Sequence, residues 1–258
     1  MAGYEFEKIG QGYAQLNFFP TTDFLFTYTL HLWKNYGYCS FFLEHRLHTM
    51  RLIIATPSPF ARKIRVVVRE KNIACDEDIH NPWNTDSTVT ELNPLGQIPI
   101  LTTDDQQQIF DSRVIFDYLE KLEPAHSLLP SDPVEQIQTR KIESVGDGIS
   151  DATVLLVMEA HRPKHLQSSD WMERQQKKVE DSLHFLDNRL KNRSWFVGDE
   201  FTLADISVGC ALSYIDLRLP YYIWREHFPN LSHFSDRIEQ RSSFKNTLLT
   251  AQEIAPVL

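Results

Sequence analysis

Residues 50–72 combine a strand-like run and a helix-like run across a four-residue turn, and this succession limits the folds open to the chain. Residues 51–55 read Arg-Leu-Ile-Ile-Ala, an apolar run of the length of a buried strand. Thr-Pro-Ser-Pro follows at 56–59, and the apolar side chains of residues 59–72 recur on one helical face. Pro59 stands in the first helical turn, where its missing N–H costs nothing. We therefore predict a strand followed directly by an amphipathic helix.

Three further strands and a second helix are predicted before residue 123. Residues 76–80 and 98–102 favour strands, and residues 107–110 return antiparallel after a tight turn. Residues 112–122 predict a helix, with these side chains facing inward: Ile115, Tyr118, Leu119 and Leu122. The order strand–helix–strand, then strand–strand–helix, predicts a parallel pair joined by a crossover helix and extended by a hairpin. This is the layout of a thioredoxin-like α/β domain.

In the second half of the chain, the apolar residues recur only with the period of a helix. Linker-type residues Leu-Leu-Pro-Ser-Asp-Pro at 128–133 separate the two halves. Three buried faces are predicted in the second half: Val134, Ile137, Ile142, Val145, Ile149 and Ala152; Val179, Leu183, Leu186 and Leu190; Ile206, Cys210 and Tyr214. Thr202 and Asp205 have the spacing of a capping box, and a last helix is expected over 230–241. We predict an all-helical domain.

Residues 1–49 differ from the rest of the chain. They are crowded with aromatic residues, and no sustained period of 2 or 3.6 runs through them. Two interpretations stay open: an extension that is not part of the native fold, or an aromatic arm that packs on the body or on a partner. The apolar-leaning run at 24–33 is far shorter than the roughly 20 residues that span a bilayer. A basic start and a small-residue cleavage site, as in secretory signals, are missing, so we expect no membrane partner.

Charge and composition exclude some classes of partner. The net charge of −9 argues against nucleic acid, which usually binds a basic face. The basic residues at 62–71 recur on the polar side of the first helix, and we interpret them as a solvated face.

Cysteine and histidine spacing gives no metal site. The three cysteines are Cys39, Cys75 and Cys210. They form no Cys-x-x-Cys motif and suit a reducing compartment, so we expect a cytoplasmic protein without structural zinc or disulfides. His161 and His165 are four apart, but Pro163 interrupts the helical face between them.

Several local patterns in a fixed order carry a family resemblance. They are Ser-Pro-Phe-Ala-Arg-Lys at 58–63, Asn-Pro-Leu-Gly-Gln-Ile-Pro at 93–99, Asp-Ser at 111–112, and Phe-Val-Gly-Asp at 196–199 before Thr-Leu-Ala-Asp at 202–205. From Met50 onward the chain resembles the cytosolic glutathione S-transferases, most closely the bacterial serine-type, YibF-like branch. The resemblance implies a thioredoxin-like domain at 50–129, an all-α domain at 133–258 and an extension at 1–49. It also implies a homodimer that takes glutathione as co-substrate.

Ser58 is the candidate catalytic residue. By itself, serine before Pro59 is a common helix N-cap. The resemblance implies in addition that its hydroxyl donates a hydrogen bond to the glutathione sulfur and holds it as thiolate. Ser58 and Ala61 stand where a glutaredoxin would carry cysteines, so the domain has no dithiol chemistry of its own. The resemblance also implies a cis peptide bond at Pro99, with the Ile98 backbone pairing with the cysteinyl unit.

The remaining binding residues follow from the same resemblance. Asp111 and Ser112 open a helix, and a helix N-terminus suits a carboxylate ligand, although both residues are also ordinary caps. The resemblance assigns Ser112 to the γ-glutamyl carboxylate and Asp111 to the γ-glutamyl ammonium. Phe60 and Gln97 complete the predicted set, with Gln97 standing where many relatives carry lysine.

The second substrate is expected between the two domains, and it is an electrophile of unspecified type. The candidates for its site are Leu155, Met158, Tyr214 and Arg162. Asp147 and Asp151 share a helical face and either border the cleft or face solvent or a dimer partner. Three functions stay open: a glutathione transferase, a non-catalytic binding module of the same fold, and a glutathione-dependent dehalogenase, lyase or peroxidase.

Overall fold

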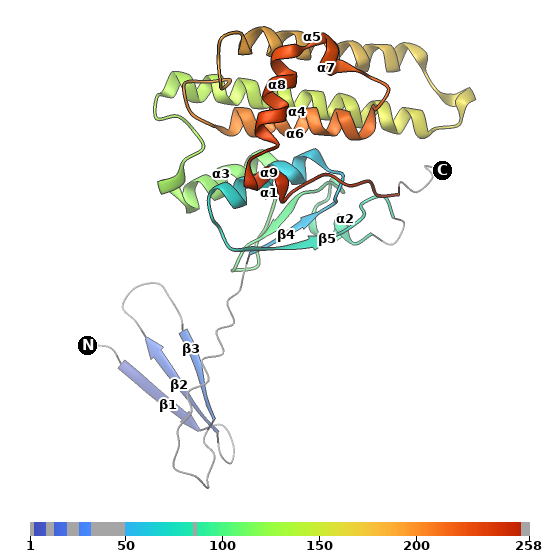
Figure 1. The fold of residues 1–258 in the computed structure, drawn as a ribbon. Coiled ribbons are helices and arrows are strands. Elements are labelled where there is room, and N and C mark those ends of the chain that lie inside the picture. Colours follow the sequence, from blue (N-terminus) through green and yellow to red (C-terminus); the bar gives the residue numbers. More distant parts are fainter. Residues whose placement is uncertain (1–2, 9–12, 20–25, 32–49, 85–86, 254–258) are drawn as a thin grey trace. The chain divides into compact units, whose positions relative to one another are not determined.

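The chain forms two compact units, and each is described by itself. A computed structural model describes residues 3–8, 13–19, 26–31, 50–84 and 87–253. The units are Met1–His48 and Thr49–Leu258 (Figure 1). Cys39 lies outside the described residues.

The first unit contains an antiparallel sheet that the sequence analysis did not anticipate. Strands β1 (Gly3–Lys8), β2 (Tyr13–Phe19) and β3 (Phe26–His31) pair in the order β1-β2-β3, with β2 in the centre. Aromatic residues alternate with glutamates in β1 and with threonines in β3. This alternation lasts for one short strand at a time, so a search for a sustained period misses it.

The second unit begins with a mixed sheet that confirms the predicted thioredoxin-like topology. Strands β4 (Met50–Ile54), β5 (Cys75–Ile79), β6 (Ile100–Thr102) and β7 (Gln108–Phe110) lie in the order β5-β4-β6-β7. β4 is parallel to β5 and antiparallel to β6, and β6 and β7 form the hairpin. The crossover helix between β4 and β5 is α1 (Pro59–Glu70).

The helices α2 and α3 and one 3-10 turn complete the thioredoxin-like half. The one-turn helix α2 (Val89–Leu92) precedes β6 and was not predicted. Helix α3 (Ser112–Leu122) follows β7 with the predicted bounds, and a 3-10 turn, η1 (Pro124–His126), comes after it. Helices α1 and α3 lie between the sheet and the helical half (Figure 1).

The rest of the second unit is helical, as predicted. Its elements are α4 (Pro133–His161), η2 (Lys164–Leu166), α5 (Ser169–Leu190), α6 (Leu203–Arg218), α7 (Trp224–His227), α8 (Pro229–Ile238) and α9 (Ser242–Lys245). The last helix expected over 230–241 corresponds to α8, and the one-turn helix α9 that follows was not predicted. No helix in the described part of the chain is both long and apolar enough to cross a membrane.

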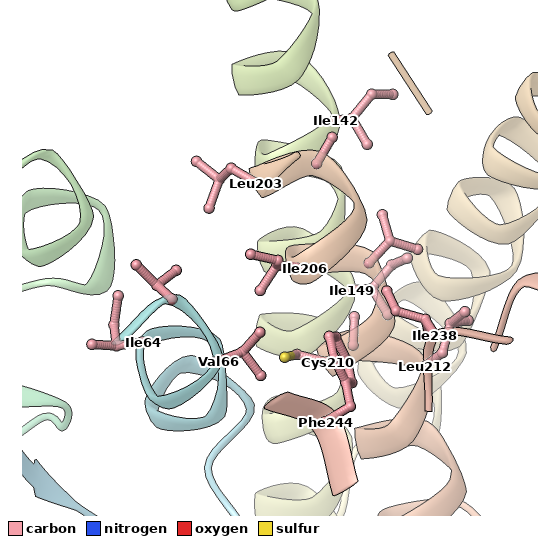
Figure 2. Close-up of a cluster of buried hydrophobic side chains, with 14 of the residues drawn as sticks. Ile64, Val66, Ile142, Ile149, Leu203, Ile206, Cys210, Leu212, Ile238 and Phe244 are labelled. Atoms are coloured by element: carbon pink, nitrogen blue, oxygen red, sulfur yellow. The ribbon is translucent and has the colours of Figure 1, made fainter. Parts of the chain in front are cut away.

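Helices α4 and α6 pack side by side and run in the same direction. In Figure 2, Ile142 lies beside Leu203 at one end and Ile149 lies near Ile206 further along. Gly146 permits this close approach, because a Cβ there would come within 2.9 Å of the Ser207 backbone. The predicted capping box at the start of α6 is present, since the Thr202 N–H donates to Asp205 Oδ2 at 2.9 Å.

Most residues of the predicted inward faces are buried, Tyr118 and Val145 are half-buried, and three residues are exposed. Leu122, Val134 and Ile137 are exposed, so these three predictions were wrong. Leu122 is the last residue of α3, whereas Val134 and Ile137 lie in the first turns of α4, before the point where α6 begins beside it. The apolar period of a helix can continue to its last residue, but the neighbouring element that buries the apolar face can be shorter. Residues beyond that neighbour are then exposed.

Candidate functional site

The seven predicted site residues line one pocket of about 420 Å³, a volume typical of ligand sites. They are Ser58, Phe60, Gln97, Ile98, Pro99, Asp111 and Ser112. They come from the start of α1, the loop before β6 and the start of α3. Residues of α4 and α6 and of the loop after β5 also line it, so both halves of the second unit contribute.

Ser58 caps the first helix and keeps a proton to donate. It has an extended backbone (φ −74°, ψ 120°), and its Oγ accepts a hydrogen bond from the Ala61 N–H at 3.2 Å. Pro59 follows in the first helical turn, as the sequence indicated. A hydroxyl has two lone pairs and one O–H, so capping leaves the O–H available. The capping role and a donor role toward a ligand are therefore compatible.

The loop before β6 is held in shape by a buried asparagine. The Asn93 side chain donates to the Gln97 carbonyl at 2.7 Å and accepts from the Leu95 N–H at 3.0 Å. Gly96 follows with φ 62°, a conformation that favours glycine. The Ile98–Pro99 peptide bond is cis, as the resemblance implied. The loop thereby carries Gln97 and Ile98 at the pocket.

The start of α3 combines an unusual backbone with a free hydroxyl. Asp111 is the N-cap with φ 62° and ψ 127°, and its Oδ1 accepts from the Arg113 N–H at 2.8 Å. Such a conformation costs about 1–3 kcal/mol for a residue other than glycine and is concentrated at functional sites. Ser112 is buried in the pocket wall, and within the described chain its hydroxyl has no hydrogen-bond partner. A ligand group could supply that partner.

The carboxylate of Asp147, a residue of α4 that lines the pocket, is hydrogen-bonded to side chains of α1 and α3. Its side chain is buried, with Oδ1 2.9 Å from Lys63 Nζ of α1 and Oδ2 2.8 Å from Arg113 Nε of α3. Lys63 also contacts Glu143 at 3.2 Å. Asp151, one turn further along α4, lines the same pocket, and burial, together with the Asp147 carboxylate, raises its pKa. Of the two sequence interpretations of this acid pair, the structure supports the cleft border.

The basic run of α1 is not a solvated face, so that prediction was wrong. Arg62, Lys63 and Lys71 are each 1% exposed. Arg62 forms two hydrogen bonds with the Glu239 carboxylate, at 2.9 and 2.8 Å, and Lys71 donates to two main-chain carbonyls at 2.7 Å. Buried charges are tolerated when they are paired in this way. Their partners lie far away in sequence, which a helical period cannot reveal.

The second-substrate candidates divide evenly. Met158 and Tyr214 line the pocket, whereas Leu155 and Arg162 do not. Leu155 is exposed. Arg162 is the C-cap of α4 and lies 3.2 Å from the carboxylate of Glu159 in the last turn of the same helix. The sequence analysis missed several lining residues: Pro82, Trp83, Arg113, Val154 and Arg218. Val154 and Arg218 had a usable signal, because each stands one helical turn from a candidate, Met158 and Tyr214 respectively.

Both halves of the second unit match domains of known proteins. Residues 57–122 match the glutathione S-transferase N-terminal domain and residues 169–237 match the C-terminal domain. A GST-like protein of Escherichia coli described as uncharacterized, YibF, is 36% identical over 198 residues, which are 77% of this chain and 98% of that protein. The chain belongs to the glutathione S-transferase superfamily.

Solved structures of the superfamily contain the expected ligand. A glutathione S-transferase of Methylobacterium radiotolerans, in complex with glutathione sulfonate, is 38% identical with a TM-score of 0.79, covering 81% of this chain and 99% of that one. One from Methylobacillus flagellatus, with glutathione bound, is 40% identical with a TM-score of 0.76, covering 78% and 100%. The covered shares are close to the share of the chain that the second unit makes up.

Proposed function

We propose that this protein is a glutathione transferase of the bacterial serine-type, YibF-like branch, which ionises glutathione and directs its sulfur onto a small electrophile. The observation that carries the proposal is the meeting of two helix N-termini, those of α1 and α3, at one pocket. Each brings a serine hydroxyl, Ser58 and Ser112. Two superfamily structures support the choice of ligand: one at 38% identity with glutathione sulfonate and one at 40% identity with glutathione bound.

The proposed role of Ser58 is to donate its O–H to the glutathione sulfur. A free thiol has a pKa near 8.5, and lowering it to roughly 6.5 requires about 2.7 kcal/mol in favour of the thiolate. One hydrogen bond to a charged group supplies about 1.5–3 kcal/mol. The N-terminus of α1 adds about 0.3–1 kcal/mol. The two contributions are sufficient without a metal ion or a general base.

The start of α3 is proposed to hold the γ-glutamyl end. Its free N–H groups and the Ser112 hydroxyl suit the carboxylate, and Asp111 suits the ammonium group. The Ile98 backbone is proposed to pair with the cysteinyl unit, while Gln97 and Phe60 contact the rest of the tripeptide. The electrophile then lies against α4 and α6, beside Met158 and Tyr214.

The organisation around this site is proposed on the same grounds. Residues 50–129 are the glutathione-binding domain, residues 133–258 are the helical domain, and the protein acts in the cytoplasm as a homodimer. Residues 1–49 are an extension that glutathione binding does not need. Deleting them tests this, because a truncated chain that loses activity or solubility contradicts it.

Two measurements on the full chain test the function. Calorimetry with glutathione should show saturable binding, and chlorodinitrobenzene should be conjugated faster than in the uncatalysed reaction. Binding without turnover of any electrophile would favour the non-catalytic module. Turnover confined to haloacids or peroxides would favour the dehalogenase, lyase or peroxidase alternatives. No binding of glutathione would overturn the proposal.

A further inference from the structure

Arg218 is a basic residue of the pocket whose charge is not matched within the described chain. It is the last residue of α6 and lines the pocket, and its Nε is buried with no hydrogen-bond partner in the described part of the chain. No carboxylate among the described residues forms an ion pair with it, whereas Arg113, the pocket's other arginine, is bonded to Asp147. An arginine side chain offers five N–H donors and no acceptor, so it needs acceptors from elsewhere.

The guanidinium stands at an apolar end of the pocket. Its carbon lies 5.9 Å from the centre of the Tyr214 ring, and Val154 and Met158 of α4 line the same pocket. Because α4 and α6 run in the same direction (Figure 2), Arg218 at the end of α6 lies toward the late turns of α4. Asp147 lies near the beginning of α6, since its neighbour Gly146 packs on Ser207.

The pocket therefore separates its charges. Asp147 and Met158 are eleven residues apart on α4, which is about 16 Å of helix rise. Asp151 interacts electrostatically with Asp111 and Asp147, and all three aspartates interact with Arg113, at the end where α3 begins. The glutathione part of the site thus contains paired acids and bases, whereas Arg218 has a hydrogen bond with the neutral Tyr214 side chain and no acid beside it.

We propose that Arg218 binds a carboxylate on the second substrate, so that the preferred electrophiles are small molecules with an apolar body and one carboxylate. This rests on the proposed transferase function. A carboxylate matches the planar guanidinium fork through two parallel hydrogen bonds, and it supplies acceptors for the N–H groups, Nε–H among them, that the hydrogen bond with the Tyr214 side chain does not satisfy. A dianionic group is less suitable, because one guanidinium carries a single positive charge. The apolar body lies between the glutathione sulfur and Arg218, against Val154 and Met158.

A matched pair of aryl chlorides tests this on the full chain. One is a chloronitrobenzoate with the carboxylate para to the chlorine, and the other is the corresponding carboxamide. In both, the glutathione sulfur bonds to the ring carbon, the carbon–chlorine bond breaks, chloride leaves with the bonding pair, and the thiol proton goes to solvent. We expect Arg218→Gln to lower kcat/KM for the benzoate at least tenfold, about 1.4 kcal/mol, through KM. The value for the carboxamide should change less than twofold.

Two variants serve as controls. Arg218→Lys keeps the charge but not the fork, and it should recover part of the benzoate activity. Arg162→Gln removes an arginine that does not line the pocket, and it should leave both substrates unchanged. Comparing each substrate between wild type and variant cancels the intrinsic difference in reactivity. Equal losses for both substrates in Arg218→Gln would mean a structural role and would overturn the proposal.

Binding of the two conjugates separates this proposal from the function on which it rests. The benzoate conjugate of glutathione should bind at least ten times more tightly than the carboxamide conjugate, and Arg218→Gln should abolish the difference. If this preference is seen without turnover, the carboxylate site stands and the transferase function fails. If neutral chlorodinitrobenzene is conjugated but the two conjugates bind equally, the transferase function stands and the carboxylate site fails.

Discussion

Helices α1 and α3 start at the same pocket, yet the two starts are built differently. Ser58 caps α1 from an ordinary extended backbone, and its oxygen is already used by the Ala61 N–H. Asp111 caps α3 from a left-handed φ of 62°, and the next residue, Ser112, keeps its hydroxyl without a partner among the described residues. The first arrangement fixes one O–H in place, which suits chemistry at a sulfur. The second leaves groups available, which suits recognition of a ligand's charged end.

The ion pairs that hold the two helix starts also differ, in how exposed they are to solvent. Lys63 of α1 and Arg113 of α3 both reach Asp147, which is 4% exposed. The Lys63 side chain is 1% exposed, whereas that of Arg113 is 50% exposed. Buried ion pairs are costly to break, but exposed ones contribute little. The comparison therefore indicates a firmly held α1 and a more lightly held α3.

The largest effect is expected at the shared acid. Asp147→Ala leaves the buried Lys63 ammonium with Glu143 alone, and it should lower the free energy of unfolding by roughly 3–5 kcal/mol. Urea denaturation measures this. Asp151→Ala, one turn along α4, is the control and should change stability by less than about 0.5 kcal/mol because no hydrogen bond or ion pair within the described chain involves that side chain. If the two losses are equal, Asp147 does not anchor α1.

Ser58→Ala should have the next largest effect, on chemistry. Losing one hydrogen bond to the thiolate corresponds to about 1.5–3 kcal/mol, so kcat should fall roughly 10–100-fold. The pKa of bound glutathione, followed by thiolate absorbance, should rise toward that of the free thiol. The lost cap should also cost about 1 kcal/mol of stability.

Two variants separate chemistry from capping at this position. Ser58→Thr keeps a hydroxyl and should retain most of the activity. Ser168→Ala removes the N-cap of α5, where Oγ accepts from the Trp171 N–H at 3.3 Å, and should cost stability without changing kcat. Survival of both kcat and the low thiol pKa in Ser58→Ala would limit Ser58 to the capping role.

At the other helix start, Ser112→Ala should weaken binding instead. Removing the free hydroxyl should raise the Kd for glutathione about tenfold, or about 1.4 kcal/mol, while kcat at saturation changes little. Calorimetry and steady-state kinetics together measure the two quantities. A variant that binds glutathione normally but turns over slowly would reverse the roles assigned to the two helices.

The sequence predicted these two helix starts unequally well. The Ser-Pro pair at 58–59 specifies a cap and a first turn through local chemistry alone, and the helix over 112–122 was predicted with its observed bounds. The left-handed backbone of Asp111 has no such local signal, because aspartate also caps helices from ordinary conformations. Neither could the sequence pair Lys63 with Asp147, since the two residues are 84 positions apart.

The second wall of the pocket was predicted least well. Met158 and Tyr214 were among the sequence candidates, but Val154 and Arg218 were not. Which residue of a long helix faces a pocket depends on the direction and offset of its neighbour, here α6 beside α4 (Figure 2). Helical period gives faces but not the offset between two helices.

The smallest effect is expected from Arg113→Gln. This variant tests most directly whether the starts of α1 and α3 are held with different firmness. This cation is half exposed, so its removal should cost at most about 1 kcal/mol of stability and raise the Kd for glutathione about two- to fivefold. Added salt should reduce the difference between variant and wild type, because exposed pairs are screened. Arg113→Lys should behave nearly as wild type. If Arg113→Gln instead destabilises the protein as much as Asp147→Ala does, the two helix starts are held equally firmly, and the separation into a chemical and a recognition end loses its structural basis.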